Sequence, residues 1–240
     1  MIKIQNLTKK YKDTVAVDNL CLEVEKGELF SLLGVNGAGK TTFIKMLSGL
    51  TKQTEGEAFV GKNSISRDIL KVKSIIGVSP QETALAPNLT VKENLELFSM
   101  IYGLSKDKTR DKIKELTENF SLGEILNKKT AKLSGGWQRR VSIAISLISE
   151  PSVLFLDEPT LGIDVIGRSE IWDTIRQLKG KVTIILTTHY MEEAAALSDR
   201  IGIMKDGKLL VTGTAESIME NTNADKFEDA FISIIKGAKI

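Results

Sequence analysis

Residues 34–42 read Gly34-Val35-Asn36-Gly37-Ala38-Gly39-Lys40-Thr41-Thr42, which matches the pattern G-x-x-x-x-G-K-[ST] at every fixed position. An apolar run, residues 29–33, precedes this stretch, and residues 42–47 follow it with helical character. A strand, a glycine-rich loop and a helix in this order are the context in which the pattern binds phosphate. The sequence therefore predicts a nucleoside triphosphate site, and the alternative is a glycine-rich turn that only caps a helix.

The loop is expected to bind phosphate mainly through its backbone. Glycines let successive N–H groups turn toward an anion at a helix N-terminus, whose partial positive charge favours it. Lys40 would reach the β- and γ-phosphates, and Thr41 would place its hydroxyl on Mg²⁺, a cation that prefers oxygen ligands. The residues predicted to bind the triphosphate are Gly34, Asn36, Gly37, Ala38, Gly39, Lys40, Thr41 and Thr42.

Composition limits the other possibilities. A chain of 240 residues can bury a core without disulfides, and its 33 basic and 31 acidic residues offer no broad basic surface for a nucleic acid. The single cysteine, Cys21, indicates a reducing compartment, and we expect it to be a small buried strand residue. No apolar run approaches the roughly 18 to 20 residues that span a bilayer, and the first residues lack a secretory signal. Any link to a membrane is therefore expected to come through a partner.

Hydrophobic spacing divides the chain. Alternation predicts half-buried strands around residues 2–4 and 15–24, and further strands are expected at 57–61 and 74–78. Helical spacing prevails from Glu82 to Glu150. Continuous apolar runs at 153–156 and 182–186 then predict two strands buried on both faces. Residues 201–211 are expected to form a hairpin with an Asp-Gly turn, and 215–240 are expected to form two short helices.

Two further motifs contain residues suited to binding an anion or to catalysis. Ser134 and two glycines open a helix, which predicts a second anion-binding N-terminus, although an ordinary Ser N-cap has the same sequence. The apolar strand from Val153 ends in Asp157 and Glu158. One carboxylate can hold the Mg²⁺ shell and the next can face the attacking water, whereas the alternative makes both residues part of a surface turn.

Together these residues resemble the ATP-binding cassette (ABC) family of transporter ATPases, from Ile2 to about Gly213. The resemblance implies ATP and Mg²⁺ as cofactors, with Glu158, His189 and Lys40 as catalytic residues. It implies Thr41, Gln81 and Asp157 as metal ligands, and Tyr11 as the aromatic residue that stacks on adenine. It also implies that Leu133 to Gly136 form the signature motif, whose Ser134, Gly135 and Gly136 complete the nucleotide site of the opposite subunit.

Several of these positions have structural alternatives. Tyr11 could be a half-buried strand aromatic, and Gln81 a plain surface turn residue. His189 is the only histidine, and lone histidines are often structural, but this one follows the C-terminal end of a strand, where ligands of parallel sheets bind. Its imidazole could donate a hydrogen bond to the γ-phosphate.

One position departs from the common family pattern. Many members carry Gln after the paired glycines, whereas this chain has Trp137. A bulky apolar residue here resembles the exporter branch that handles drugs, sodium or polysaccharide. Because Gly136 and residues 138–140 around it are polar or exposed types, a buried-core role for Trp137 is not expected.

The predicted fold is α/β: a RecA-like P-loop ATPase core with an antiparallel β patch and an inserted α-helical subdomain. The resemblance implies that the whole chain, 1–240, forms one ABC ATPase domain. Residues 1–81 and 151–213 would form the core, 82–150 the helical subdomain with the signature motif, and 214–240 a short helical tail.

The expected function follows from the resemblance. Two ATPase subunits, more readily a homodimer than a heterodimer, would close on ATP and drive export through integral membrane permease subunits on a separate chain. The chain would be peripheral, at the cytoplasmic face of the cell membrane, and no nucleic acid partner is expected. The alternatives are an importer ATPase, a soluble family member acting in translation or DNA maintenance, and an unrelated P-loop kinase or GTPase.

Overall fold

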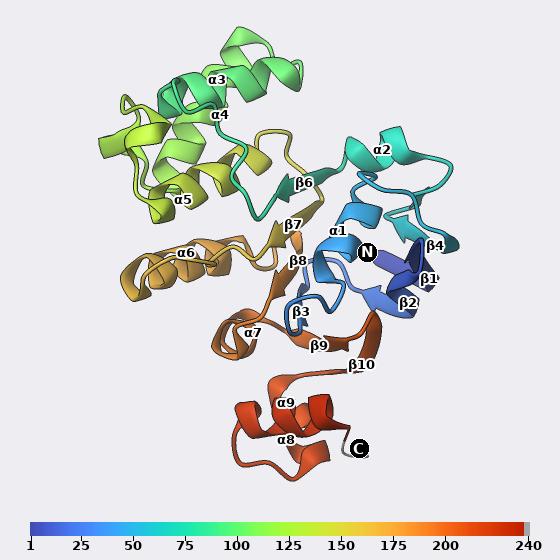
Figure 1. Cartoon of the computed structure of the whole chain (residues 1–240). Coiled ribbons are helices and arrows are strands. Elements are labelled where there is room, and N and C mark those ends of the chain that lie inside the picture. Colours follow the sequence, from blue (N-terminus) through green and yellow to red (C-terminus); the bar gives the residue numbers. More distant parts are fainter. Residues whose placement is uncertain (238–240) are drawn as a thin grey trace.

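The computed structural model describes residues 1–237 and contains two sheets with helices around them (Figure 1). Residues 238–240 of the expected tail lie outside the described part. The first sheet is antiparallel and has the strand order β2-β1-β4-β5. Its strands are β1 (Ile2–Tyr11), β2 (Thr14–Val24), β4 (Glu55–Val60) and β5 (Asn63–Ser64).

The second sheet has the order β10-β9-β3-β8-β7-β6, with only β10 antiparallel to its neighbour. Its strands are β3 (Leu29–Leu33), β6 (Ile76–Ser79), β7 (Val153–Asp157), β8 (Thr183–Thr188), β9 (Arg200–Lys205) and β10 (Lys208–Gly213). Every residue of β3, β7 and β8 is buried, as their continuous apolar runs predict. The expected α/β architecture is confirmed.

Helices cover both faces of the second sheet. Helix α1 (Lys40–Leu47) packs its apolar side, including Phe43 and Met46, into a core shared with the antiparallel sheet. On the other face, α5 (Gly135–Ser146) and α6 (Val165–Leu178) form a second core with Leu154 and Leu186. The strand ends that carry the predicted site are therefore held between two packed layers.

The segment between β6 and β7 is helical. It contains α3 (Val91–Ile101), α4 (Lys106–Asn119), the 3₁₀ turns η1 (Gly123–Ile125) and η2 (Thr130–Lys132), and α5. A capping box fixes the start of α3, because Thr90 accepts from the Glu93 amide and Glu93 accepts from the Thr90 amide. In Figure 1 these helices lie together on one side of the sheets.

The last part of the chain is also helical. Helix α7 (Met191–Leu197) follows β8, and α8 (Ala215–Thr222) and α9 (Phe227–Lys236) follow β10. They share a core with β9 that includes Ile201, Ile218 and Phe231. Within residues 1–237, no helix combines the length and the apolar character needed to cross a membrane.

Three details differ from the sequence expectations. A short helix, α2 (Ile69–Lys73), precedes β6, where no element was predicted. Cys21 is exposed, because Leu20 and Leu22 face the core and strand residues alternate between faces. Trp137 is half-buried and packs against the second core, with Arg140 stacked 4.5 Å from its ring centre.

Candidate functional site

The phosphate loop connects β3 to α1. Gly39, immediately before α1, has φ +105°, and a Cβ there would lie 2.1 Å from the Ala16 carbonyl oxygen. A Cβ on Gly34 would lie 2.3 Å from the Met204 carbonyl oxygen. Only glycine can therefore occupy either position. Through these close contacts the loop packs against β2 and β9. The N-terminus of α1 then faces the cavity described below.

Lys40 is almost fully buried, at 5% exposure. Its Nζ donates to the carbonyl oxygens of Gly34 at 2.7 Å and Val35 at 3.2 Å. It also lies 3.2 Å from Glu158 Oε1. A buried ammonium group requires such partners, and the three oxygens hold the charge at the base of the phosphate loop.

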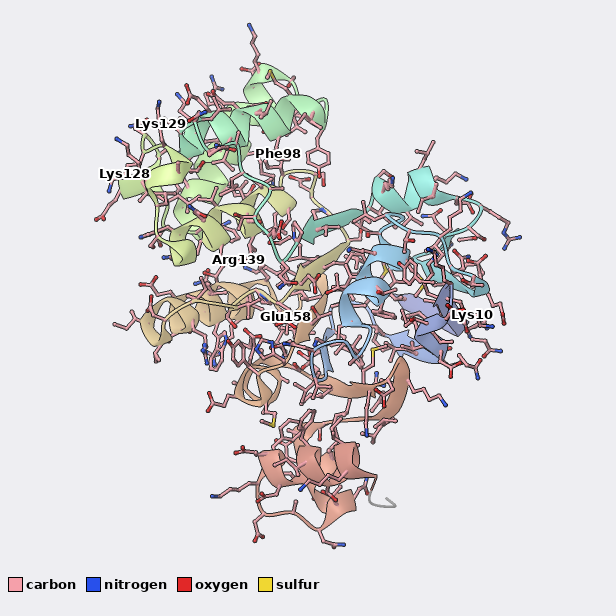
Figure 2. The ribbon with its side chains drawn as sticks, viewed as in Figure 1. Lys10, Phe98, Lys128, Lys129, Arg139 and Glu158 are labelled. Atoms are coloured by element: carbon pink, nitrogen blue, oxygen red, sulfur yellow. The ribbon has the colours of Figure 1, made fainter. Side chains whose placement is uncertain are left out.

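Glu158 is the centre of the site and lies beside the loop that precedes α1 (Figure 2). It follows β7 directly and adopts φ +50°, a conformation that costs a non-glycine residue roughly 1 to 2 kcal/mol. Its amide donates to the Thr187 carbonyl oxygen at 3.0 Å, which holds the strained backbone in place. Its Oε2 contacts His189 Nδ1, so Lys40 and His189 approach the two oxygens of one buried carboxylate.

Asp157 is the last residue of β7 and is buried. Its Oδ1 accepts hydrogen bonds from the hydroxyls of Thr41, at 3.3 Å, and Thr187. The strand pairing of β7 with β8 places Asp157 opposite Thr187. Carboxylate and hydroxyl oxygens from three elements therefore meet beside the first turn of α1.

A cavity of about 610 Å³ joins most of the predicted site residues. Its lining contains the phosphate loop from Asn36 to Thr42 with Gln81, Glu158 and His189. It also contains residues that the sequence did not indicate, namely Thr14, Val15, Ala16 and Asp206. A larger groove of about 840 Å³ lies among β1, β2, β9 and β10, but it contains none of the motif residues. The smaller cavity is therefore the candidate site.

Asp206 comes to the cavity through the hairpin. The Asp206-Gly207 turn was predicted, but its position was not, since the Gly207 amide donates to the Ala38 carbonyl oxygen across 169 residues of sequence. Its approach to the phosphate loop follows from the pairing of β9 with β3. No local sequence feature could have indicated it.

Four predicted parts of the site do not line the cavity: Gly34, Asp157, Tyr11 and the Ser134–Gly136 end. Tyr11 is 44% exposed, and Lys9 Nζ lies 4.7 Å above its ring centre. Its strand partner, Thr14, does line the cavity. Ser134, Gly135 and Gly136 begin α5, and a Cβ on Gly135 would face Ile163 rather than the phosphate loop.

A further buried carboxylate, that of Glu193, lies near Glu158. Glu193, on α7, is fully buried, and its Oε1 accepts hydrogen bonds from the Thr160 hydroxyl at 2.8 Å and from Trp172 Nε1 at 3.0 Å. Burial raises the pKa of Glu193 above its usual value, and the nearby charge of Glu158 adds to the increase. Glu193 thus joins α6, α7 and the loop that follows Glu158.

Comparison with known proteins identifies the family. The family model described as ABC transporter matches residues 17–161, more than half of the chain. The chain belongs to the ABC transporter family. It is 40% identical over 228 residues to the daunorubicin resistance ATP-binding protein DrrA3 of Streptomyces coeruleorubidus, covering 95% of this chain and 72% of that protein.

Other ABC relatives differ in length. The linearmycin resistance ATP-binding protein LnrL of Bacillus subtilis is 38% identical, with 99% of this chain and 77% of LnrL covered. The human phospholipid-transporting ATPase ABCA3 is 42% identical over 89% of this chain, which spans only 13% of ABCA3. The exporter-type resemblance of the sequence is confirmed by relatives named for drug resistance.

Solved ABC structures share the fold. An ATP-binding subunit of an ABC transporter has a TM-score of 0.86 at 25% identity, covering 98% of this chain and 99% of the other. The cassette MJ0796, in a dimeric post-hydrolysis state bound to ADP and Pi, has a TM-score of 0.80 at 30% identity, covering 89% and 98%. This ABC chain is therefore an ATP-binding and ATP-hydrolysing transporter component.

Proposed function

We propose that this chain is the ATPase subunit of an exporter and works as a homodimer with permease subunits on separate chains. The observation that carries the proposal is the approach of Lys40 and His189 to the two oxygens of Glu158 beside the phosphate loop. The names of DrrA3 and LnrL, together with Trp137 after the paired glycines, support export. The subunit would act peripherally at the cytoplasmic face of the membrane.

The phosphate loop binds the triphosphate in this proposal. Backbone N–H groups at the start of α1 face the β-phosphate, and Lys40 bridges the β- and γ-phosphates. Lys40 Nζ lies 3.2 Å from Glu158 Oε1, so both groups are placed where the γ-phosphate would meet them. In this proposal the γ-phosphate is the anionic partner of Lys40, and Glu158 faces the attacking water.

The oxygen atoms near α1 suit Mg²⁺. The Thr41 hydroxyl and the Asp157 carboxylate lie 3.3 Å apart, and both are hard oxygen ligands. With Gln81, which lines the same cavity, these residues would hold the ion. Bound Mg²⁺ supplies charge neutralisation at the β- and γ-phosphates.

Glu158 and His189 carry out the hydrolytic step. Glu158 orients the water and accepts its proton as the water oxygen attacks the γ-phosphorus and the bond to the β-phosphate oxygen breaks. His189 holds Glu158 through Nδ1 and meets the γ-phosphate through its other ring nitrogen. Tyr11 stacks on adenine once nucleotide brings the β1–β2 turn toward the base.

The second subunit completes the site. Ser134, Gly135 and Gly136 of one subunit would face the γ-phosphate held by the other, since they lie away from the cavity of their own chain. The helical segment 82–150 turns against the core formed by 1–81 and 151–213, with Gln81 at the hinge. The tail 214–240 stays packed on β9 through its described part.

The test uses Glu158→Gln, which keeps the shape of the side chain and removes the base. ATP should bind and remain unhydrolysed, so an ATP-bound dimer should accumulate. Gel filtration with ATP and Mg²⁺ measures it, with ADP and the wild-type chain as controls. A variant that binds ATP yet elutes only as monomer would overturn the homodimer: either the partner is a different chain or the site is not shared.

A further inference from the structure

Arg139, on α5, is a buried cation whose hydrogen bonds within residues 1–237 all go to main-chain oxygens. It is 4% exposed. Its Nη1 donates to the Pro80 carbonyl oxygen at 2.5 Å, and its Nη2 donates to the Gln81 carbonyl oxygen. Among residues 1–237 no carboxylate forms an ion pair with it. In Figure 2, Arg139 lies where the helices after β6 meet the rest of the molecule.

Burying the Arg139 guanidinium costs desolvation free energy, so its presence at this position requires an explanation. Burial lowers the pKa of Arg139 below its usual value, and the charges of Asp157 and Glu193 only partly oppose that effect. Its Nε is buried without a partner within the described residues. An uncharged side chain could fill the same space without this desolvation. What the guanidinium adds is a planar pair of donors that holds two successive carbonyl groups in one orientation.

A second hydrogen bond attaches the end of β6 to α5. The hydroxyls of Ser79 and Ser142 lie 3.0 Å apart, and both residues are buried. Ser142 lies three residues after Arg139, on the same face of the helix. The end of β6 and the first residues of the following loop are thus attached to α5 at Ser79, Pro80 and Gln81.

The attachment joins two parts of the proposed nucleotide site. Gln81 lines the cavity of its own chain. Ser134 precedes α5 and lies five residues before Arg139, about 7.5 Å along the helix axis at the usual rise per residue. A short, rigid segment of α5 therefore connects two parts of the molecule. One is the loop at Gln81, which lines the nucleotide cavity of its own chain, and the other is the Ser134 end, which is proposed to meet the nucleotide of the partner subunit.

We propose that Arg139 is a positioning residue that holds the Gln81 main chain on α5, so that nucleotide contact at Gln81 moves the Ser134–Gly136 end. The inference rests on the proposed function of Gln81 and Ser134. Arg139 itself touches neither nucleotide nor water in this mechanism. Its role is to make the loop and the helix respond as one unit.

Hydrogen exchange tests whether Arg139 holds the Gln81 main chain on α5, an attachment that we call the clamp. We would compare Arg139→Met, Arg139→Lys and a matched control, Lys112→Met, all in the Glu158→Gln chain. Lys112 is also a buried cation of the helical segment, but it pairs with Glu115 and Glu150, away from Gln81. Without nucleotide, the hydrogen-bonded amides of β6 and of Ala86 should exchange roughly tenfold faster in Arg139→Met than in Lys112→Met, as expected for losing hydrogen bonds from a charged donor.

The second measurement adds ATP at saturation. In Lys112→Met, residues 134–138 should gain protection, whereas in Arg139→Met this response should be lost while ATP affinity stays unchanged. Arg139→Lys, which keeps the charge but has a single donor nitrogen, should give an intermediate result and carries the test if Arg139→Met does not fold. Equal exchange at β6 and Ala86 in Arg139→Met and Lys112→Met would overturn the clamp.

The two proposals fail differently. If the Glu158→Gln chain stays monomeric with ATP, the homodimer fails, but the comparison at β6 and Ala86 without nucleotide still decides whether Arg139 holds the loop. If the dimer forms and Arg139→Met responds at 134–138 as Lys112→Met does, the proposed function stands and the role of Arg139 is refuted.

Discussion

At the residue scale, the site is built from charges that are costly to bury alone. Lys40, Asp157 and Glu158 are all at most 6% exposed. Each has partners: Lys40 and His189 approach Glu158, and two threonine hydroxyls donate to Asp157. Removing one partner leaves another charge uncompensated, so single substitutions here should have large effects.

Lys40→Ala should weaken ATP binding, because it removes a desolvated, charge-assisted contact with the γ-phosphate. Such a contact contributes on the order of 1.5 to 3 kcal/mol. Titration with a fluorescent ATP analogue measures the loss. The matched control is Lys45→Ala, which removes an exposed lysine from the same helix, α1. Equal affinity in the two variants would refute the role of Lys40.

Glu193→Gln should flatten the pH dependence of stability. Because the folded pKa of Glu193 is raised, the folded chain binds the proton more tightly than the unfolded chain, whose pKa is near 4.5. The stabilising contribution of neutral Glu193 is complete below that value and is lost as pH rises through the folded pKa. The unfolding free energy of the wild type should therefore fall more with rising pH than that of Glu193→Gln.

Urea unfolding at a series of pH values measures this difference. Glu192→Gln is the control, because Glu192 is the exposed neighbour, with 83% of its side chain accessible. Its pH profile should run parallel to that of the wild type. Parallel profiles for Glu193→Gln as well would show that folding does not raise the pKa of Glu193.

At the element scale, α5 begins differently from several other helices. Thr90, Ser105 and Thr214 each accept a hydrogen bond from the backbone of the helix that they precede. Within the described part of the chain, the Ser134 side chain makes no such bond. Its hydroxyl is therefore not used to cap its own helix, which agrees with a role toward a ligand of the partner subunit.

The two tryptophans allow the start of α5 to be followed. Trp137 is half-buried on α5, and Trp172 lies on α6 with its indole bonded to Glu193. If the start of α5 enters the interface, Trp137 should lose its remaining water, and emission should shift to shorter wavelength when ATP is added to Glu158→Gln. ADP should cause no shift.

Single-tryptophan chains separate the two reporters. Trp172→Phe leaves Trp137 as the reporter and should keep the ATP-dependent shift, whereas Trp137→Phe should lose it. Should the shift persist in Trp137→Phe and vanish in Trp172→Phe, the start of α5 does not enter the interface.

At the scale of the whole molecule, the phosphate loop and the start of α5 do not share one cavity within the chain. A head-to-tail dimer would give two sites, each with a phosphate loop from one subunit and a signature end from the other. This geometry makes a complementation experiment decisive. In a mixed dimer, two different defects fall on the same site and leave the other site intact.

The experiment mixes two inactive chains, both carrying Glu158→Gln. One also carries Lys40→Ala and the other Ser134→Arg. Neither should dimerise alone with ATP, but the mixture should form an ATP-dependent heterodimer with one intact site, detected by gel filtration of differently tagged chains. If each site belonged to a single chain, the mixture would contain no intact site and would stay monomeric.

The sequence alone determined the features that depend on near neighbours. The strand, glycine loop and helix around Lys40 are contiguous, and so is the Asp206-Gly207 hairpin; their residue types specify backbone conformation directly. Alternation along β2 also specifies an outward Cys21, so the expected burial of this residue was wrong on local grounds. The five-residue helix α2 was missed because it is too short to show a period.

Only the tertiary structure decided which distant residues meet. Asp206 reaches the phosphate loop because β9 pairs with β3, and Glu193 is buried because α7 packs beside α6. Arg139 holds the loop at Gln81, 58 residues away in sequence. These side chains look like ordinary surface charges in sequence, since burial and partners arise from sheet order and helix packing, which depend on the whole chain at once.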